Sequence, residues 1–115
     1  MDTLTVERPW GKFELFTANQ QCSVKILTIK PYSSISLQYH NHREEFWHIV
    51  VGSAKITIGD KTLQAKAGDE FFIPKKTNHR IETQNETLKV LEIMYGKFDE
   101  EDNVRLEDKY GRVKK

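Results

Sequence analysis

Hydrophobic and polar residues alternate in short runs along most of this chain, and turn residues separate the runs. The clearest pair covers residues 54–58 and 61–66, which flank Gly59-Asp60, a two-residue hairpin signal. Further runs of this kind cover residues 12–16, 22–30, 35–42, 45–51, 70–73, 79–83 and 88–95. Because no apolar period of 3.6 residues persists, the sequence predicts an all-β sandwich or barrel of at least eight short strands.

The middle of the chain holds three of its four histidines. Gln38, His40 and His42 alternate, so on an extended strand their side chains leave the same face. Glu45 begins the next run, and His79 follows a proline-containing loop that can return to the same place. Imidazoles with a carboxylate are the ligand set of a divalent transition metal. The sequence therefore predicts a metal site built from these residues.

Four phrases spread over nearly the whole chain point to a family. They are residues 8–11 (RPWG), 35–47 (ISLQYHNHREEFW), 73–80 (IPKKTNHR) and 104–112 (VRLEDKYGR). In this order they resemble the type II mannose-6-phosphate isomerase domain of the cupins, which often follows a mannose-1-phosphate guanylyltransferase. The resemblance implies one cupin domain over residues 1–115, with the double-stranded β-helix or jelly-roll fold. No glycine-rich phosphate-binding loop is present, so we expect no nucleotide chemistry.

The same resemblance implies an activity and a cofactor. The expected activity is the metal-dependent interconversion of mannose 6-phosphate and fructose 6-phosphate, with a small sugar phosphate as the partner molecule. The expected cofactor is a divalent metal ion, with zinc as the first choice and manganese, cobalt or nickel as alternatives. The competing hypothesis is a metal-binding cupin without this catalysis, such as a sugar-binding module or a sensor, because fold does not fix function.

Two registers of the metal ligands are open. If His40 and His42 are the H-x-H pair of the cupin signature, only two residues precede Glu45, whereas the signature has three or four. If Gln38 and His40 are the pair, four residues precede Glu45. Both registers use one strand face, so periodicity does not separate them. We favour Gln38, His40, Glu45 and His79 as inner ligands, with His42 as a fifth ligand or a proton-transfer group.

The family phrases also suggest residues for substrate binding and catalysis. A phosphate group is best held by an arginine fork, and Arg43 and Arg80 each follow a histidine of the family phrases. The plainer interpretation is a pair of surface arginines paired with nearby glutamates. His42, Arg43 and Glu44 are the candidates for catalysis, and the general base is either His42 or Glu44.

Composition excludes some classes of function. The formal net charge is +1, from 18 basic and 17 acidic residues spread along the chain, which gives no argument for nucleic-acid or membrane binding. One cysteine, Cys22, allows no internal disulfide, and the chain starts without a signal segment, so we expect a cytoplasmic protein. We interpret Cys22 as a small buried hydrophobe and the acidic run 99–102 as a solvated segment.

Two further expectations concern single side chains. His48 shares the strand face of Phe46 and Val50, opposite Glu45, and is expected to be a packing or surface residue. Trp10 and Phe16 are aromatic residues near expected sheet edges, which a second copy of the chain can cover, so we expect a homodimer.

Overall fold

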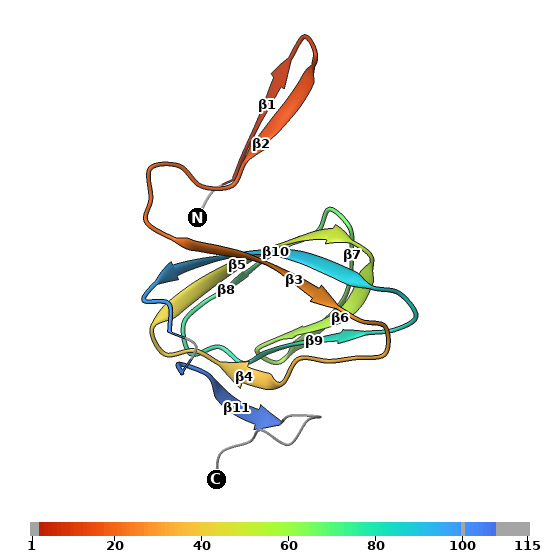
Figure 1. Cartoon of the computed structure of the whole chain (residues 1–115), viewed down its shortest axis with the longest axis vertical. Coiled ribbons are helices and arrows are strands. Elements are labelled where there is room, and N and C mark those ends of the chain that lie inside the picture. The colour runs from red at the N-terminus through yellow and green to blue at the C-terminus, as the bar shows by residue number, and fades with distance from the viewer. Residues whose placement is uncertain (1–2, 100, 108–115) are drawn as a thin grey trace.

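The structure is a computed structural model that describes residues 3–99 and 101–107. The regular secondary structure of these residues consists of β-strands alone. The strands form two antiparallel sheets and a separate hairpin (Figure 1). The predicted all-β fold is therefore confirmed. The described segments contain no helix that could cross a membrane.

The two sheets lie face to face and enclose a common core (Figure 1). The four-stranded sheet has the order β3 (Ser23–Ile29), β10 (Leu88–Gly96), β5 (Arg43–Val51) and β8 (Glu70–Ile73). The five-stranded sheet has the order β11 (Val104–Glu107), β4 (Leu37–Tyr39), β9 (His79–Thr83), β6 (Ser53–Ile58) and β7 (Lys61–Lys66). From β3 onward every connection except the β6–β7 hairpin crosses between the sheets, which is the connectivity of a jelly roll.

The side chains that point into the space between the sheets are apolar at one end of this interior and polar at the other. On β5 the inward residues run in the order Glu45, Trp47 and Ile49, all of them buried. Ile49 packs among the aliphatic side chains of the core, whereas Glu45 lies at the end where β5 and β9 begin. The apolar end holds the sheets together, and the polar end is free to carry chemistry.

The strand predicted to carry the first two histidines is shorter than the sequence predicts. It covers Leu37–Tyr39 only, and the chain bends at Asn41 and His42. The cause is Asp102, whose carboxylate accepts hydrogen bonds from the backbone N–H groups of Asn41 at 3.0 Å and His42 at 2.9 Å. The prediction of a merely solvated acidic run was therefore wrong at Asp102, which orders the loop that follows β4.

The hairpin β1 (Leu4–Arg8) and β2 (Gly11–Leu15) projects away from the two sheets (Figure 1). The sequence predicts β2 as a half-buried edge strand, but its residues are exposed and its partner β1 was not predicted. The short strand β11 was also not predicted. It pairs with β4, and so it closes the edge of the five-stranded sheet beside the polar end of the interior.

The turn between β5 and β6 requires a glycine. Gly52 has φ of +90°, and a Cβ there would lie 2.3 Å from the backbone oxygen of Thr87. Gly68 has a similar φ of +95°, but no atom lies within 4 Å of the corresponding Cβ position. An alanine at position 68 would therefore suffer backbone strain alone, whereas an alanine at position 52 would suffer the same strain and a steric overlap.

We expect Gly68→Ala to lower the free energy of unfolding by about 1–2 kcal/mol, the usual penalty for a left-handed L-residue. Gly52→Ala should cost at least about 2 kcal/mol more, because the overlapping atoms belong to backbone that cannot rotate away. Urea unfolding of both variants checks this. Equal losses in the two variants would contradict the steric argument.

Candidate metal centre

Three predicted ligands meet at the polar end of the interior. His40 follows β4, Glu45 lies on β5 and His79 begins β9, and all three side chains are buried. The Nε2 atoms of the two histidines are 3.2 Å apart. Glu45 places Oε2 3.3 Å from His40 Nε2 and Oε1 3.6 Å from His79 Nε2. One ligand atom from each residue lies within 4.8 Å of the others, so this cluster could hold a metal ion.

Backbone carbonyl groups fix the orientation of both imidazole rings. His40 Nδ1 lies 2.8 Å from the carbonyl oxygen of Asp102, and His79 Nδ1 lies 3.0 Å from that of Thr77. A carbonyl oxygen only accepts, so each Nδ1 carries the proton and each neutral ring presents a bare Nε2 lone pair. Two lone pairs and a carboxylate then converge on one buried point. Two imidazole nitrogens and a carboxylate are a donor set that suits a divalent metal.

The charge state of the cluster agrees with metal binding. Burial by itself would raise the pKa of Glu45, but hydrogen bonds with His40 and Glu92 and the electrostatic interactions with His79 and His40 lower it to about 2. Burial lowers the pKa of His79, against the opposing charge of Glu45 and the Thr77 carbonyl. At neutral pH the site therefore offers an ionised carboxylate and a neutral imidazole, the forms that bind metal.

Arg43 lies inside the site, as the sequence predicts for a functional arginine. Its guanidinium donates from Nε to Glu45 Oε2 at 3.1 Å and from Nη2 to His40 Nε2 at 3.2 Å, and it stacks over the ring of Phe98 at 5.1 Å. Its third nitrogen, Nη1, is buried and has no hydrogen-bond partner among the described residues. A buried cationic donor without a partner indicates a position for an anionic ligand.

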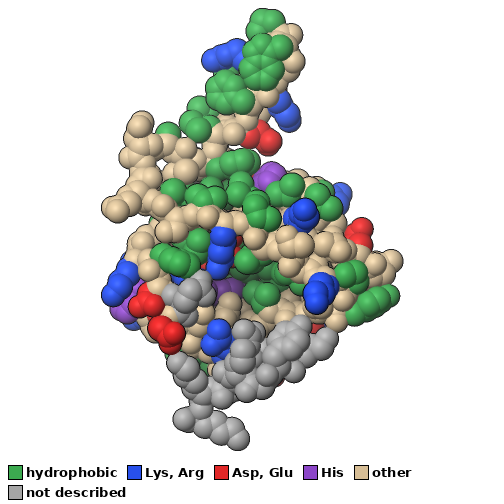
Figure 2. All heavy atoms as spheres, viewed as in Figure 1, with side chains coloured by type: hydrophobic (Ala, Val, Ile, Leu, Met, Phe, Trp, Pro, Cys, Tyr) green, Lys and Arg blue, Asp and Glu red, His purple; other side chains and the backbone are tan. Residues whose placement is uncertain are grey.

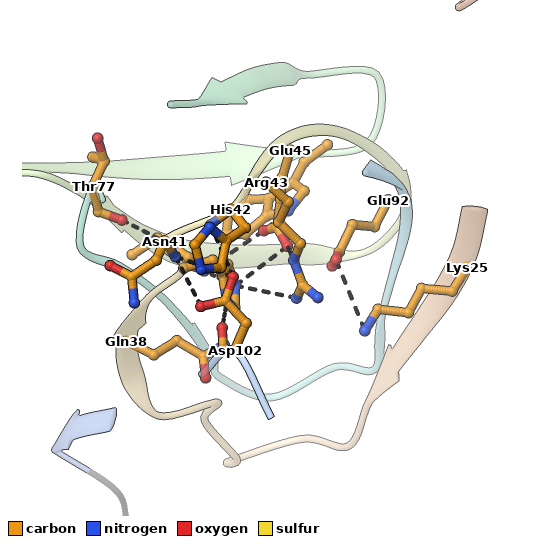
Figure 3. Close-up of polar contacts among 12 residues, drawn as sticks. Lys25, Gln38, Asn41, His42, Arg43, Glu45, Thr77, Glu92 and Asp102 are labelled. Atoms are coloured by element: carbon orange, nitrogen blue, oxygen red, sulfur yellow. Dashed lines mark hydrogen bonds and ion pairs between the residues drawn. The ribbon is translucent and has the colours of Figure 1, made fainter. Parts of the chain in front are cut away.

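The side chain of Gln38 lines a cavity between the two sheets that Arg43, Glu45 and His79 also line (Figure 3). Its backbone is paired with that of His79, and its Oε1 accepts a hydrogen bond from Ser36 Oγ at 2.9 Å. Gln38 is therefore close to the cluster with its amide oxygen already engaged. Its place among the inner ligands remains a prediction.

Three other predicted residues are not brought to the cluster. His42 is exposed, because the bend after β4 removes it from the strand face that Gln38 occupies. Glu44 is on the outer face of β5, where it lines a groove together with Phe16 and Tyr95. Arg80 points away from the site and pairs with Glu107 at 3.2 Å. The expectation that His42 shares a strand face with Gln38 was wrong.

Two side chains that we expected to have structural roles do so. His48 pairs with Glu70 at 2.8 Å and packs on the ring of Phe16 on the outer face of the four-stranded sheet. Cys22 is half-buried and packs against a small cluster of apolar residues on the same face. Neither residue lines the metal centre.

A cavity of about 170 Å³ opens beside the cluster, between the two sheets. It is lined by Lys25, Leu27, Ile35, Ser36, Gln38, Arg43, Glu45, Trp47, His79, Glu92, Asn103 and Arg105. The lining includes cationic side chains from both sheets and a second carboxyl group in addition to Glu45. A small anionic molecule is therefore matched in charge to this space.

Sequence reasoning missed Glu92 and Arg105. Glu92 is buried on β10 next to Glu45, and Lys25 reaches toward it from β3 with its Nζ 3.9 Å from Oε1 (Figure 3). Burial, followed by the charge of Glu45, raises the pKa of Glu92 to about 8. The sequence does contain a signal for Glu92. It is the charged residue that follows Leu88 and Val90 at every second position, on a strand face that is otherwise apolar and therefore expected to point inward.

Arg105 lies on β11 and lines the cavity from the side opposite β10. Its Nε is buried without a hydrogen-bond partner among the described residues, as Arg43 Nη1 is. The signal for Arg105 was its place in the last family phrase, but only the pairing of β11 with β4 shows that this phrase reaches the site.

Comparison with known proteins identifies relatives of the whole chain. The family described as mannose-6-phosphate isomerase C-terminal matches residues 2–108. The chain is 38% identical over 110 residues to the mannose-1-phosphate guanylyltransferase ManC of Salmonella typhimurium, covering 94% of this chain and 23% of that protein. The alginate biosynthesis protein AlgA of Pseudomonas aeruginosa gives the same identity and coverage. The chain thus spans about a quarter of the length of these relatives.

Solved structures support the cupin fold. A Cupin 2 conserved barrel domain protein from Salinispora arenicola superposes with a TM-score of 0.60 at 18% identity, covering 81% of this chain and 73% of that one. At this identity the likeness concerns the fold alone. It agrees with the jelly-roll connectivity of the two sheets.

We expect the purified chain to bind about one divalent ion, and His40→Ala or His79→Ala to weaken that affinity more than ~100-fold, because each removes a bare lone pair from the cluster. His42→Ala should retain the affinity, since that ring is exposed. Calorimetric titration with zinc checks all three variants. Gln38→Ala with unchanged affinity, together with a His42→Ala variant that no longer binds metal, would show that the favoured ligand set is wrong.

Proposed function

Because the chain belongs to the mannose-6-phosphate isomerase C-terminal family, we propose that it is a metal-dependent aldose–ketose isomerase acting on mannose 6-phosphate and fructose 6-phosphate. The observation that supports this most is the cluster of His40, His79 and Glu45 beside a cavity that is also lined by cationic side chains. A bound divalent ion would supply Lewis-acid polarisation of the sugar oxygens at C1 and C2. Zinc is the first choice, with manganese, cobalt or nickel as alternatives.

The phosphate group would bind at the cationic side of the cavity. Arg43 Nη1 and Arg105 Nε are buried cavity donors without partners among residues 3–99 and 101–107. A phosphate can accept hydrogen bonds from several guanidinium donors at once, and binding there removes the penalty of leaving them unpaired. Arg105 therefore replaces Arg80 in the proposed phosphate site, because Arg80 is directed at Glu107.

Isomerisation requires a group that moves a proton between the adjacent carbons C1 and C2 of the sugar. His42 and Glu44 lie away from the cavity, so neither is suited to this role. Glu92 lies in the cavity wall on the strand next to Glu45. Its carboxyl group is not one of the favoured metal ligands, and we assign it the proton transfer. Arg43 holds Glu45 in place through its Nε, and Glu92 is the other carboxyl group that lines the cavity.

In a coupled assay we expect the metal-loaded chain to convert mannose 6-phosphate to fructose 6-phosphate, and a chelator to abolish the activity. Glu92→Gln should lower kcat by ~10²-fold or more, because an amide cannot carry the proton. The same variant should keep its metal, as elemental analysis of the protein used in the assay would verify.

The assay also distinguishes the competing hypothesis. A chain that binds metal but turns over no hexose phosphate would be a metal-binding cupin of another kind, either a sugar-binding module or a sensor. Activity that persists in Glu92→Gln would instead keep the isomerase and move the proton transfer to another residue.

We expect Arg105→Ala to raise KM for mannose 6-phosphate by ~10–100-fold, the effect of losing one or two charge-assisted hydrogen bonds to phosphate. Arg80→Ala is the matched control, because it removes an arginine that faces away from the cavity and should leave KM unchanged. Steady-state kinetics of the two variants checks this. A larger effect at Arg80 than at Arg105 would place the phosphate outside the cavity.

A further inference from the structure

Arg43 and a metal ion need the same lone pair of His40. Because Nδ1 of His40 donates to the carbonyl oxygen of Asp102, the ring offers one lone pair, at Nε2. Arg43 Nη2 donates a hydrogen bond to this nitrogen at 3.2 Å. A single lone pair can accept an N–H or bind a metal, but it cannot do both. The guanidinium and a metal are therefore alternative partners of His40.

Two other groups lie close to His40 Nε2, but neither of them is a donor. His79 Nε2 is 3.2 Å away and Glu45 Oε2 is 3.3 Å away. The Nδ1 of His79 donates to a backbone carbonyl, so its Nε2 is bare, and an ionised carboxylate only accepts. Among the described residues in contact with this nitrogen, Arg43 alone brings an N–H. Its hydrogen bond therefore decides whether the lone pair of His40 is available to a metal.

Glu45 does not depend on Arg43 alone for its orientation. Its Oε2 accepts from Arg43 Nε at 3.1 Å, and its Oε1 accepts from the indole Nε1 of Trp47 at 3.3 Å. Trp47 is buried in the apolar core, so the direction of its N–H is fixed by packing. If Arg43 turns, the carboxylate keeps a donor that holds it in place. Arg43 is thus free to change partners without releasing Glu45.

The cavity beside the cluster offers Arg43 a second position for Nη2. Lys25 and Arg105 line this space together with Arg43, and Figure 2 shows a hollow in the surface below β3 with basic side chains beside it. In Figure 3 the guanidinium lies between the cluster and Glu92, another residue of the cavity lining. Its central carbon is 5.1 Å from the ring centre of Phe98, and a turn within its own plane keeps this stacking. Such a turn carries Nη2 from the cluster to the cavity.

We propose that Arg43 couples metal binding to substrate binding: when His40 binds a metal, Arg43 withdraws Nη2 from His40 and directs it at an anion in the cavity. Linkage then requires that the anion strengthens metal binding by the same factor as the metal strengthens anion binding. The inference rests on the proposed isomerase only for the identity of the anion, a sugar phosphate. The competition for His40 involves no turnover.

Zinc affinity of the full chain, measured against a chromophoric chelator, tests the competition. Arg43→Lys keeps the charge, but one ammonium cannot hold Glu45 and His40 together and should stay on the carboxylate, its stronger partner. We expect this variant to bind zinc at least ~10-fold more tightly than the wild type, the effect of removing one charge-assisted hydrogen bond from His40.

Other roles of Arg43 give a different sign in the same measurement. An arginine that only supports Glu45 predicts weaker zinc binding in Arg43→Lys, and one that acts only by charge repulsion predicts no change. Either result, or a wild type that binds no zinc, would overturn the proposal.

The coupling is measured on the wild type, so it does not depend on how well a variant folds. Zinc titrations are repeated with saturating mannose 6-phosphate and with sulfate, each against chloride at the same ionic strength. We expect each anion to tighten zinc binding ~10-fold or more in the wild type and by less than about threefold in Arg43→Lys. Arg105→Ala is the matched control, because it removes a cavity cation that does not hold His40. It should bind the anions more weakly but keep the full coupling at saturation.

The two anions separate this inference from the proposed isomerase. Coupling with sulfate but not with mannose 6-phosphate would support the role of Arg43 and count against the proposed substrate. Coupling with neither anion, or equal coupling in Arg43→Lys and the wild type, would overturn the inference whether or not the chain is an isomerase.

Discussion

The structure depends on a buried carboxylate whose charge has to be balanced. Glu45 is 1% exposed and touches both imidazole rings of the cluster and the guanidinium of Arg43. An isolated ionised carboxylate in such a position would be too costly to bury, so its partners must be delivered by separate strands at the same point. The jelly roll does this because β4, β5 and β9 all reach the polar end of the interior. The apolar residues at the other end hold that arrangement in place.

The loop before β11 belongs to the same arrangement. The backbone oxygen of Asp102 fixes the ring of His40, while its carboxylate accepts the N–H groups of Asn41 and His42. Burial by itself would raise the pKa of Asp102, but these hydrogen bonds together lower it. One residue therefore selects the tautomer of a candidate ligand and turns the chain toward β5. The same segment brings Arg105 to the cavity, which links the end of the described chain to the proposed phosphate site.

The sequence predicted the sheet fold from strand alternation. It also predicted that His40, Glu45 and His79 lie close together, from the spacing of the histidines and the resemblance of the phrases around them to a family. It misplaced His42, since the pattern continues through residue 42 while the contacts of Asp102 end the strand at Tyr39. No local pattern shows a bend that a residue sixty positions later imposes. The position of Glu92 could have been predicted, because it is a charged residue on the inward face of a strand. The position of Arg105 could not, because it depends on the pairing of β11 with β4.

The geometry around Arg43 explains why an arginine suits this position better than a lysine. Nε and Nη2 are held by Glu45 and His40, so the plane of the guanidinium is fixed and Nη1 has one direction open to it. The ring of Phe98 supports one face of that plane. A lysine ammonium is a single point of charge and could not hold the carboxylate and still present a donor elsewhere. The same side chain can therefore position a candidate metal ligand and still direct a donor at an anion in the cavity.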